Sequence, residues 1–258
     1  RGQESSRIWR SMRRSNGFTI SLERLLSRRQ VVTLLGTSGA LWLMGGHLFS
    51  RQSIAGTHVP SCVVRPEQTE GPYFVDERLN RYDIRSDPST GLVKAGTPLT
   101  LALQVFRMGS GDCQPLAGAQ VDIWHCDALG VYSDVRDAGF NTIGQKFLRG
   151  YQITDAHGEA KFVTIYPGWY AGRTVHIHVK VRTAHDAERH SEFTSQMYFD
   201  DGLTDRVYAD QPYASKGRRN ARNQDDRIFR RGGDHLMLAP TATANGYAAS
   251  FGIGLQLS

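Results

Sequence analysis

Cysteine is scarce in this sequence of 258 residues, and the spacing of the few cysteines argues against the common structural zinc sites. The three are Cys62, Cys113 and Cys126, and no two have the spacing of a zinc ribbon or finger. In an oxidising compartment one pair could form a disulfide and leave one thiol over. We favour Cys62–Cys113, because Cys113 lies in a loop-like GSGDCQP stretch and Cys62 lies beside Pro60, whereas Cys126 lies in an apolar strand. The sequence alone does not fix this pairing.

Most of the chain also lacks an excess of charge of either sign. The formal net charge is +6, but nine arginines against two acidic residues give residues 1–51 a net charge of +7. The 22 basic and 23 acidic side chains of residues 52–258 leave that part at −1. The sequence therefore gives little support to a phosphate-binding patch, and no nucleic-acid partner is expected.

A convincing membrane-spanning run is missing as well. The charge-free residues 31–49 are just long enough to span a bilayer, and four glycines, a serine and two threonines weaken that interpretation. A basic stretch, an apolar stretch and then small residues are typical of an export signal. The pair Arg28-Arg29 in SRRQVV resembles a twin-arginine signal. We expect export to the periplasm or the cell exterior, with cleavage after Ala55 and no membrane partner afterwards; a retained anchor helix is the alternative.

We divide the chain into an N-terminal extension with this signal, residues 1–55, and one domain, residues 56–258. From Cys62 onward the dominant period of apolar residues is two, which predicts strands. The predicted strands are residues 97–106, 121–126, 147–154, 159–165, 174–183, 193–199 and 247–257. Segments of about 8–12 residues between turns, with no convincing amphipathic helix, predict an all-β fold, an antiparallel β-sandwich. The polar residues 202–231 predict a long surface excursion with at most a short helix.

The residues with the most chemistry lie in YPGWYAGRTVHIH, residues 166–178. Residues i and i+2 of a strand point to the same face, so His176 and His178 would project together and could bind one metal ion. Alternating histidines also occur on the polar face of a half-exposed strand. Tyr170, which follows a Pro-Gly turn, and Arg173, three residues before His176, favour the metal site.

This segment resembles the iron-binding core of the intradiol ring-cleavage dioxygenases, the family of catechol 1,2-dioxygenase and protocatechuate 3,4-dioxygenase. In that family a tyrosine, an arginine and an H-x-H motif follow one another in this order. WHCDALGVY, residues 124–132, is similar to a second family motif, which ends in another tyrosine. TEGPY, residues 69–73, is similar to a segment that lines the family's substrate pocket. The three segments occur in family order and span roughly residues 60–257.

The resemblance implies one ferric ion per chain, bound by Tyr132, Tyr170, His176 and His178, with long loops around this site at one end of the sandwich. Phenolates are hard anionic donors that suit oxidised iron. Free tyrosine has a pKa of about 10, so only a strongly polarising cation holds two phenolates near neutral pH. Ferrous oxygenases use two histidines and a carboxylate, and no carboxylate in this sequence has a comparable placement.

The implied activity is Fe(III)-dependent insertion of O2 into catechol-type aromatics, with intradiol ring cleavage to muconate-type diacids. A small aromatic diol and O2 are thus the expected partners. Tyr170 would be a catalytic group as well as a ligand, and Arg173 would stabilise negative charge on the bound ring. Gln196 matches a glutamine of the family's pocket. One wall of the substrate site would be formed by Gly71, Pro72 and Tyr73.

Two other classes of function stay open at this point. One is a β-sandwich binding module that has the family's shell without turnover, and oxygen uptake with catechols would separate it from the enzyme. The other is a zinc or copper protein that uses His176 and His178, which metal analysis would reveal. Nothing before Cys62 matches the helical segment through which catechol 1,2-dioxygenases dimerise. Together with the expected export signal, this favours the compact, secreted, single-chain branch of the family, and an oligomer stays possible.

Overall fold

The computed structural model describes residues 62–109, 112–186 and 189–256, without the side chains of residues 184–190. The expected export signal, its cleavage point after Ala55 and the boundary between the two predicted parts of the chain lie outside the described residues. Within the described ranges, no helix has the length and apolar character needed to cross a membrane.

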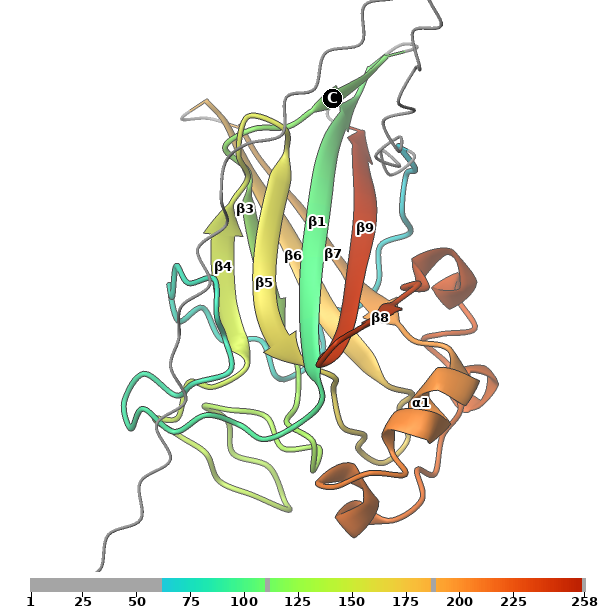
Figure 1. Cartoon of the computed structure of the whole chain (residues 1–258). Helices are drawn as coiled ribbons and strands as arrows, with labels where there is room; N and C mark the ends of the chain where they lie inside the picture. Colours follow the sequence, from blue (N-terminus) through green and yellow to red (C-terminus); the bar gives the residue numbers. More distant parts are fainter. Residues whose placement is uncertain (1–61, 110–111, 187–188, 257–258) are drawn as a thin grey trace, which may run out of the picture. The chain divides into compact units, whose positions relative to one another are not determined.

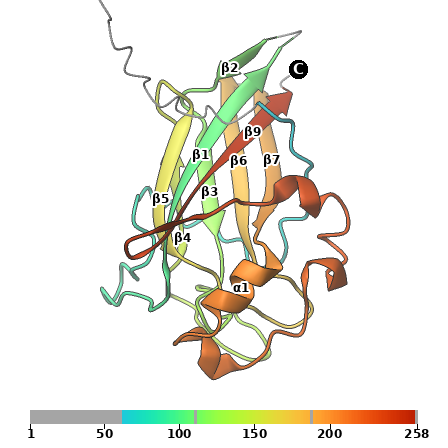
Figure 2. The ribbon, with the colours of Figure 1, turned by 45° about the vertical axis from the view of Figure 1, so that its right-hand side comes forward.

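The described strands form two sheets that pack face to face (Figures 1 and 2). The first sheet contains β1 (Pro98–Met108), β2 (Cys113–Pro115), β5 (Glu159–Ile165), β8 (Thr241–Thr243) and β9 (Gly246–Gln256). The second has the order β4-β3-β6-β7 and contains β4 (Arg149–Ile153), β3 (Gln120–Trp124), β6 (His176–Asp186) and β7 (Arg189–Tyr198). Apolar side chains of both sheets form one core between them. The predicted β-sandwich is confirmed.

One pairing in the first sheet departs from the predicted antiparallel arrangement. β9 runs parallel to β1, with Leu99 opposite Tyr247 and Met108 opposite Gln256. The other paired strands of the described residues are antiparallel. Because β1 and β9 lie far apart in the sequence, no short turn fixes their relative direction, as it would in a hairpin.

The strand β6 presents different side chains to its two faces. Ile177, Val179 and Val181 point into the core between the sheets and are fully buried. The other face carries His176, His178, Lys180 and Arg182, which follow one another at every second position. This second face holds the histidines of the predicted metal site.

The chain around residues 70–76 covers that second face of β6. Lys180 forms an ion pair with Glu70, and Arg182 forms one with Asp76 at 2.9 Å. The Lys180 ammonium lies 4.7 Å from the centre of the Phe74 ring. The segment with the predicted substrate wall is therefore held at both ends by the strand that carries the histidines.

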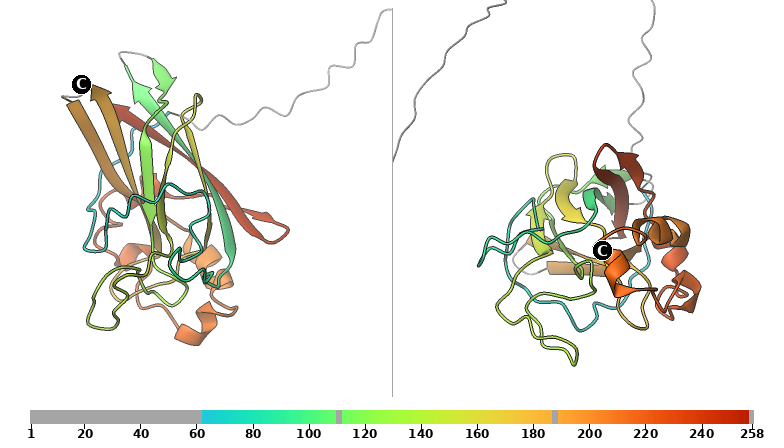
Figure 3. Two further views of the ribbon diagram at one scale, coloured as in Figure 1. Left: turned by 90° about the vertical axis from the view of Figure 1, so that its left-hand side faces the viewer. Right: turned by 60° about the horizontal axis from the view of Figure 1, so that its bottom comes forward.

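The excursion between β7 and β8 contains one short helix, as expected, and three 3-10 turns. These are α1 (Asp201–Val207), η1 (Tyr213–Lys216), η2 (Asn223–Asp225) and η3 (Gly233–Leu236). Most of the excursion is exposed or half-buried, but Tyr213, Asp226 and Phe229 on it are buried. Figures 2 and 3 show the excursion beside the loops at one end of the sheets. The excursion therefore packs beside the loops that the fold gathers at this end.

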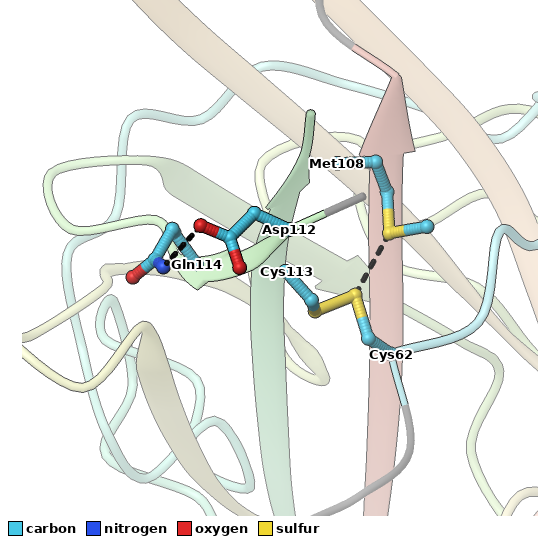
Figure 4. The surroundings of a disulfide bond; sticks show 5 residues. All are labelled: Cys62, Met108, Asp112, Cys113 and Gln114. Atoms are coloured by element: carbon cyan, nitrogen blue, oxygen red, sulfur yellow. Dashed lines mark hydrogen bonds between the residues drawn. A yellow bond between two sulfur atoms is a disulfide. The ribbon is translucent and has the colours of Figure 1, made fainter. Parts of the chain in front are cut away.

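The predicted disulfide joins Cys62 to Cys113 (Figure 4). Cys113 pairs with Met108 at the end of β1, and the Met108 sulfur lies 2.8 Å from the Cys62 sulfur. Cys126 is a free and buried thiol, as the favoured pairing requires.

Candidate active site

The predicted metal ligands come from three chain segments that meet at the same end of the sandwich. His176 and His178 open β6, Tyr132 lies in the loop after β3, and Tyr170 lies between β5 and β6. The backbone register places His178 opposite Trp124, the last residue of β3. The structure thus brings together four side chains that are spread over 47 positions of the sequence, from residue 132 to residue 178.

The two histidines direct the same ring nitrogen toward each other. Their Nε2 atoms lie 3.1 Å apart, and both side chains are buried. His176 Nδ1 lies 2.6 Å from the Thr174 carbonyl oxygen. Because a carbonyl can only accept, Nδ1 of His176 carries the proton and its Nε2 keeps a free lone pair. The His178 ring stacks on Trp124, with the ring centres 4.8 Å apart.

The two tyrosines flank the histidine pair. The Tyr170 hydroxyl lies 3.3 Å from His176 Nε2, and the Tyr132 and Tyr170 rings meet edge to face with their centres 5.6 Å apart. The Tyr132 ring centre lies 6.2 Å from that of His178. Tyr132 is 1% exposed, and its hydroxyl has no hydrogen-bond partner among the described residues.

Burial sets the protonation of this cluster. It lowers the pKa of His176 and of His178 well below the usual value, so both imidazoles are neutral at pH 7. It raises the pKa of Tyr132 well above its usual value and that of Tyr170 to about 12, where the nearby Arg173 opposes the shift. Without a bound cation, both tyrosines are therefore neutral phenols.

These residues fit a ferric ion on the chemistry of the donor set. A buried hydroxyl without a partner is costly, and coordination by a cation would compensate Tyr132 for that loss. Neutral imidazoles and phenolates are the forms that bind metals, and a trivalent cation favours loss of the phenolic protons. No group of three or more His, Cys, Asp and Glu side chains that could hold a metal ion occurs in residues 62–109, 112–186 and 189–256.

Arg173 lies beside Tyr170, with its guanidinium held on three sides. Its Nη1 donates to the Tyr170 hydroxyl at 3.3 Å, its Nε donates to Asp226 Oδ2 at 2.8 Å, and its Nη2 donates to Gln196 Oε1. Burial alone would lower the pKa of Arg173, but Tyr170 and Asp226 raise it above the usual value. The guanidinium is therefore a fixed positive charge next to the tyrosine.

Gln196 is fully buried on β7 and connects Arg173 to the covering segment. Its backbone pairs with that of His178, and its Nε2 donates to the Thr69 carbonyl at 2.9 Å. The side chain thus joins the arginine to residues 69–73, the predicted substrate wall.

Two of the three predicted wall residues contact the cluster. A Cβ atom on Gly71 would lie 3.5 Å from His178 Cε1, so this glycine lies against the imidazole. The Tyr73 ring stacks on Tyr132, with the centres 4.4 Å apart, and its hydroxyl donates to Asp137 at 2.7 Å. Pro72 is exposed to solvent. Of the predicted wall, the first and third residues therefore lie against the cluster, and the second does not.

Sequence reasoning missed two side chains that organise the site. Asp226 holds Arg173, but its neighbour Asp225 has the same side chain, and both lie in a polar stretch without a distinguishing pattern. The Lys216 ammonium donates to the carbonyls of Leu129 and Trp169, one on each tyrosine loop. No local sequence signal marks either residue, because their partners are distant in the sequence.

The fold and the cluster together define a class of protein: a two-sheet β-sandwich with tyrosines, histidines and an arginine gathered in the loops at one end. A sequence model of a family described as dioxygenase matches residues 69–224, which is more than half of the chain. The chain belongs to the intradiol ring-cleavage dioxygenase family.

Two curated relatives illustrate the similarity. Chlorocatechol 1,2-dioxygenase of Pseudomonas putida is 29% identical over 157 residues, which are 52% of this chain and 53% of the relative. The protocatechuate 3,4-dioxygenase beta chain of Burkholderia cepacia is 31% identical over 137 residues, which are 50% and 56% of the two chains. The chain therefore spans about half the length of the curated relatives it matches.

A solved structure extends the comparison over the described domain. The intradiol ring-cleavage dioxygenase from Tetranychus urticae is 27% identical and superimposes with a TM-score of 0.64. The match covers 76% of this chain and 95% of that structure. The similarity therefore extends beyond the half of the chain that the curated relatives match.

Proposed function

We propose that this protein is an Fe(III)-dependent dioxygenase that opens catechol-type rings between the two hydroxylated carbons. The observation that carries the proposal is the cluster of Tyr132, Tyr170, His176 and His178 beside Arg173, in a chain of the intradiol family. One aromatic diol and one O2 would give one muconate-type diacid, with both oxygen atoms retained in the product.

The four-residue cluster would hold the metal through its two phenolic oxygens and two Nε2 atoms. When bound, ferric iron would supply a Lewis acid that holds the diol as its dianion and draws electron density from the ring. The Thr174 carbonyl keeps His176 in the tautomer with a free Nε2. Trp124 fixes the plane of His178 by stacking.

Two residues would handle protons and charge. Tyr170 lies at the more accessible side of the cluster, and its phenolate would accept a proton from the diol as substrate binds. Arg173, next to that hydroxyl, would stabilise the negative charge on the deprotonated ring. A fixed cation in a site shielded from water is a large contribution to catalysis.

The zinc or copper protein and the binding module without turnover predict different results in one experiment. Protein folded with ferrous iron in air, and then desalted, should be red to burgundy from phenolate-to-iron charge transfer. It should consume one O2 per catechol, and the diacid product should contain two labelled oxygen atoms when the gas is ¹⁸O2. A colourless, zinc-containing preparation would overturn the iron assignment. Coloured protein without oxygen uptake across a panel of catechols would support the binding module.

We further propose export through the twin-arginine pair Arg28-Arg29, to the periplasm or the cell exterior. The disulfide Cys62–Cys113 supports this proposal, because such bonds persist in oxidising compartments and are rare in the cytosol. The pair of arginines lies outside the described residues and is supported by the sequence alone.

A further inference from the structure

Asp226 is a buried carboxylate outside the predicted ligand set, and among the described residues its side chain accepts hydrogen bonds from the segment just before β6 and from its own turn. Its side chain is 1% exposed. Oδ2 accepts from Arg173 Nε at 2.8 Å and from the Thr174 amide at 3.1 Å. Oδ1 accepts from the amides of Ile228 and Phe229 at 2.7 and 3.4 Å. Each oxygen therefore has its own set of donors.

This arrangement fixes the plane of the guanidinium. With Nε held by Asp226, the planar fork of Arg173 directs Nη1 to the Tyr170 hydroxyl and Nη2 to Gln196. The Thr174 amide shares the same carboxylate oxygen, so the backbone between Arg173 and His176 is fixed by the same contact. A guanidinium without this anchor could rotate away from Tyr170.

We propose that Asp226 is the positioning residue for Arg173, so that the excursion between β7 and β8 sets the direction of the positive charge in the active site. The inference rests on the proposed ring-cleavage function. The Asp226 side chain bonds to Arg173 and to the Thr174 amide, and within the part of the chain that the structure describes it forms no hydrogen bond with the tyrosines or histidines of the cluster.

Asp226→Asn is an informative variant because asparagine has the same shape but only one acceptor oxygen. It can satisfy either the Arg173 and Thr174 donors or the turn amides of residues 228 and 229. The matched control is Asp225→Asn, which removes the same charge one position away. Asp225 is exposed and accepts from the Arg222 amide at 2.9 Å.

The kinetic test is a double-mutant cycle on the iron-loaded protein. Asp226→Asn should lower kcat about 100-fold, as a displacement of roughly 1 Å in a catalytic group does. KM for catechol should change by no more than about threefold, and Asp225→Asn should match wild type. Arg173→Ala should lose about 100- to 1000-fold by analogy with removal of one oxyanion donor. Adding Asp226→Asn to it should cost less than about threefold more.

Two outcomes of the cycle would overturn the proposal. Losses that multiply in the double variant would show that Asp226 acts independently of Arg173. Unchanged kcat in a folded Asp226→Asn protein would show that the contact does not position the arginine. If Asp226→Asn does not fold, Asp226→Glu keeps the charge but displaces the guanidinium by one methylene. Its kcat should then fall about tenfold, and wild-type activity would again contradict the proposal.

A second readout does not depend on ring cleavage. In ¹⁵N-labelled protein loaded with Ga(III), a redox-inactive ion of the same charge, the Arg173 Nε–H resonance should be protected from solvent exchange. It is assigned by its loss in Arg173→Ala. Asp226→Asn should accelerate this exchange at least tenfold, and Asp225→Asn should leave it unchanged. Wild-type protein without oxygen uptake would refute the proposed function, whereas equal exchange in wild type and Asp226→Asn would refute the positioning role.

Discussion

The two tyrosines of the cluster differ in exposure, in charge environment and in packing. Tyr132 is 1% exposed and stacks against Tyr73, whereas Tyr170 is partly exposed and contacts the Arg173 guanidinium. Arg173 opposes the effect of burial on the pKa of Tyr170, which is about 12. Under the proposed function, we therefore expect the Tyr170 phenolate to move and take up a proton, and Tyr132 to stay in place.

This difference predicts unequal spectra for Tyr132→Phe and Tyr170→Phe after anaerobic addition of catechol to the iron-loaded proteins. The Tyr170→Phe complex should resemble the wild-type complex, because a Tyr170 that has accepted a proton from the diol is a neutral phenol and would no longer contribute a tyrosinate band. The Tyr132→Phe complex should lack the remaining tyrosinate band. Visible absorption and resonance Raman spectra measure both.

Tyr73→Phe is the control for the tyrosine spectra, since Tyr73 contacts both rings and donates to Asp137 instead. Its complex should keep the tyrosinate band. If the Tyr132 and Tyr170 variants show the reverse pattern, their roles are exchanged, although both could still be ligands.

Single site residues could be predicted where the two-residue period of a strand or a family motif indicates the direction of their side chains. His176 and His178 follow from the two-residue period of a strand, and the structure places their Nε2 atoms 3.1 Å apart. Asp226 was not predictable, because its partner Arg173 is 53 positions away and Asp225 is chemically identical. Local patterns report which way a side chain points, and long-range contacts decide what it meets.

At the scale of elements, long strands were predicted well and very short ones were missed. The predicted strand 159–165 coincides with β5. β2 and β8 have three residues each, too few to display an alternation, and they exist because β1 and β9 provide partners. The parallel direction of β9 likewise depends on tertiary packing and has no signature in its own residues.

The loops that carry the two tyrosines are joined by a close approach at Gly130. This glycine has φ 79°, and a Cβ atom there would lie 2.1 Å from the Trp169 carbonyl oxygen and 2.2 Å from Lys216 Nζ. The same lysine donates to the Trp169 and Leu129 carbonyls. Any larger residue would push apart the loops that lead to Tyr132 and Tyr170.

Gly130→Ala should therefore destabilise the fold and weaken iron binding. The positive φ alone costs about 1–2 kcal/mol, and the clash should add about 1–3 kcal/mol. Thermal unfolding measures the first effect, and competition for iron with a chelator measures the second. The reason for both is the enforced separation of the two tyrosine loops.

Gly118→Ala is the matched control for the cost of placing alanine at a positive φ. Gly118 has φ 78°, but a Cβ atom there would meet nothing within 4 Å. The Gly118→Ala variant should lose only about 1–2 kcal/mol of unfolding free energy, the cost of the positive φ, and should bind iron as wild type does. Equal behaviour of the two alanine variants would mean that the contact with Trp169 and Lys216 has no role in the site.

At the scale of the whole domain, the disulfide and the cluster lie at opposite ends of the sandwich. Cys113 pairs with Met108 at one end of β1, whereas Pro98 at the other end pairs with Ile165, which leads into the Tyr170 loop. Mutations at the disulfide should therefore change the free energy of unfolding without changing iron binding or activity.

Replacing both Cys62 and Cys113 by alanine should lower the free energy of unfolding by about 4 kcal/mol, for a cross-link between residues 51 positions apart. The iron content, the colour and kcat of the folded variant should stay within about twofold of wild type. Cys126→Ala, which removes the free buried thiol, is the control with both half-cystines intact. A colourless double variant that remains folded would show that the disulfide end and the site are coupled.

The redox state of Cys62 and Cys113 should report the compartment in which the protein resides, because disulfides persist in oxidising compartments and are rare in the cytosol. Arg28→Lys/Arg29→Lys should leave folded, iron-loaded protein in the cytoplasm, with Cys62 and Cys113 reduced and open to thiol labelling. The sequence contains a matched control in a second arginine pair, Arg13-Arg14. The corresponding lysine variant of that pair should be exported and oxidised as the unaltered chain is. Export of the Arg28-Arg29 variant at the original level would refute this signal, and retention of the control alone would transfer the role to the earlier pair.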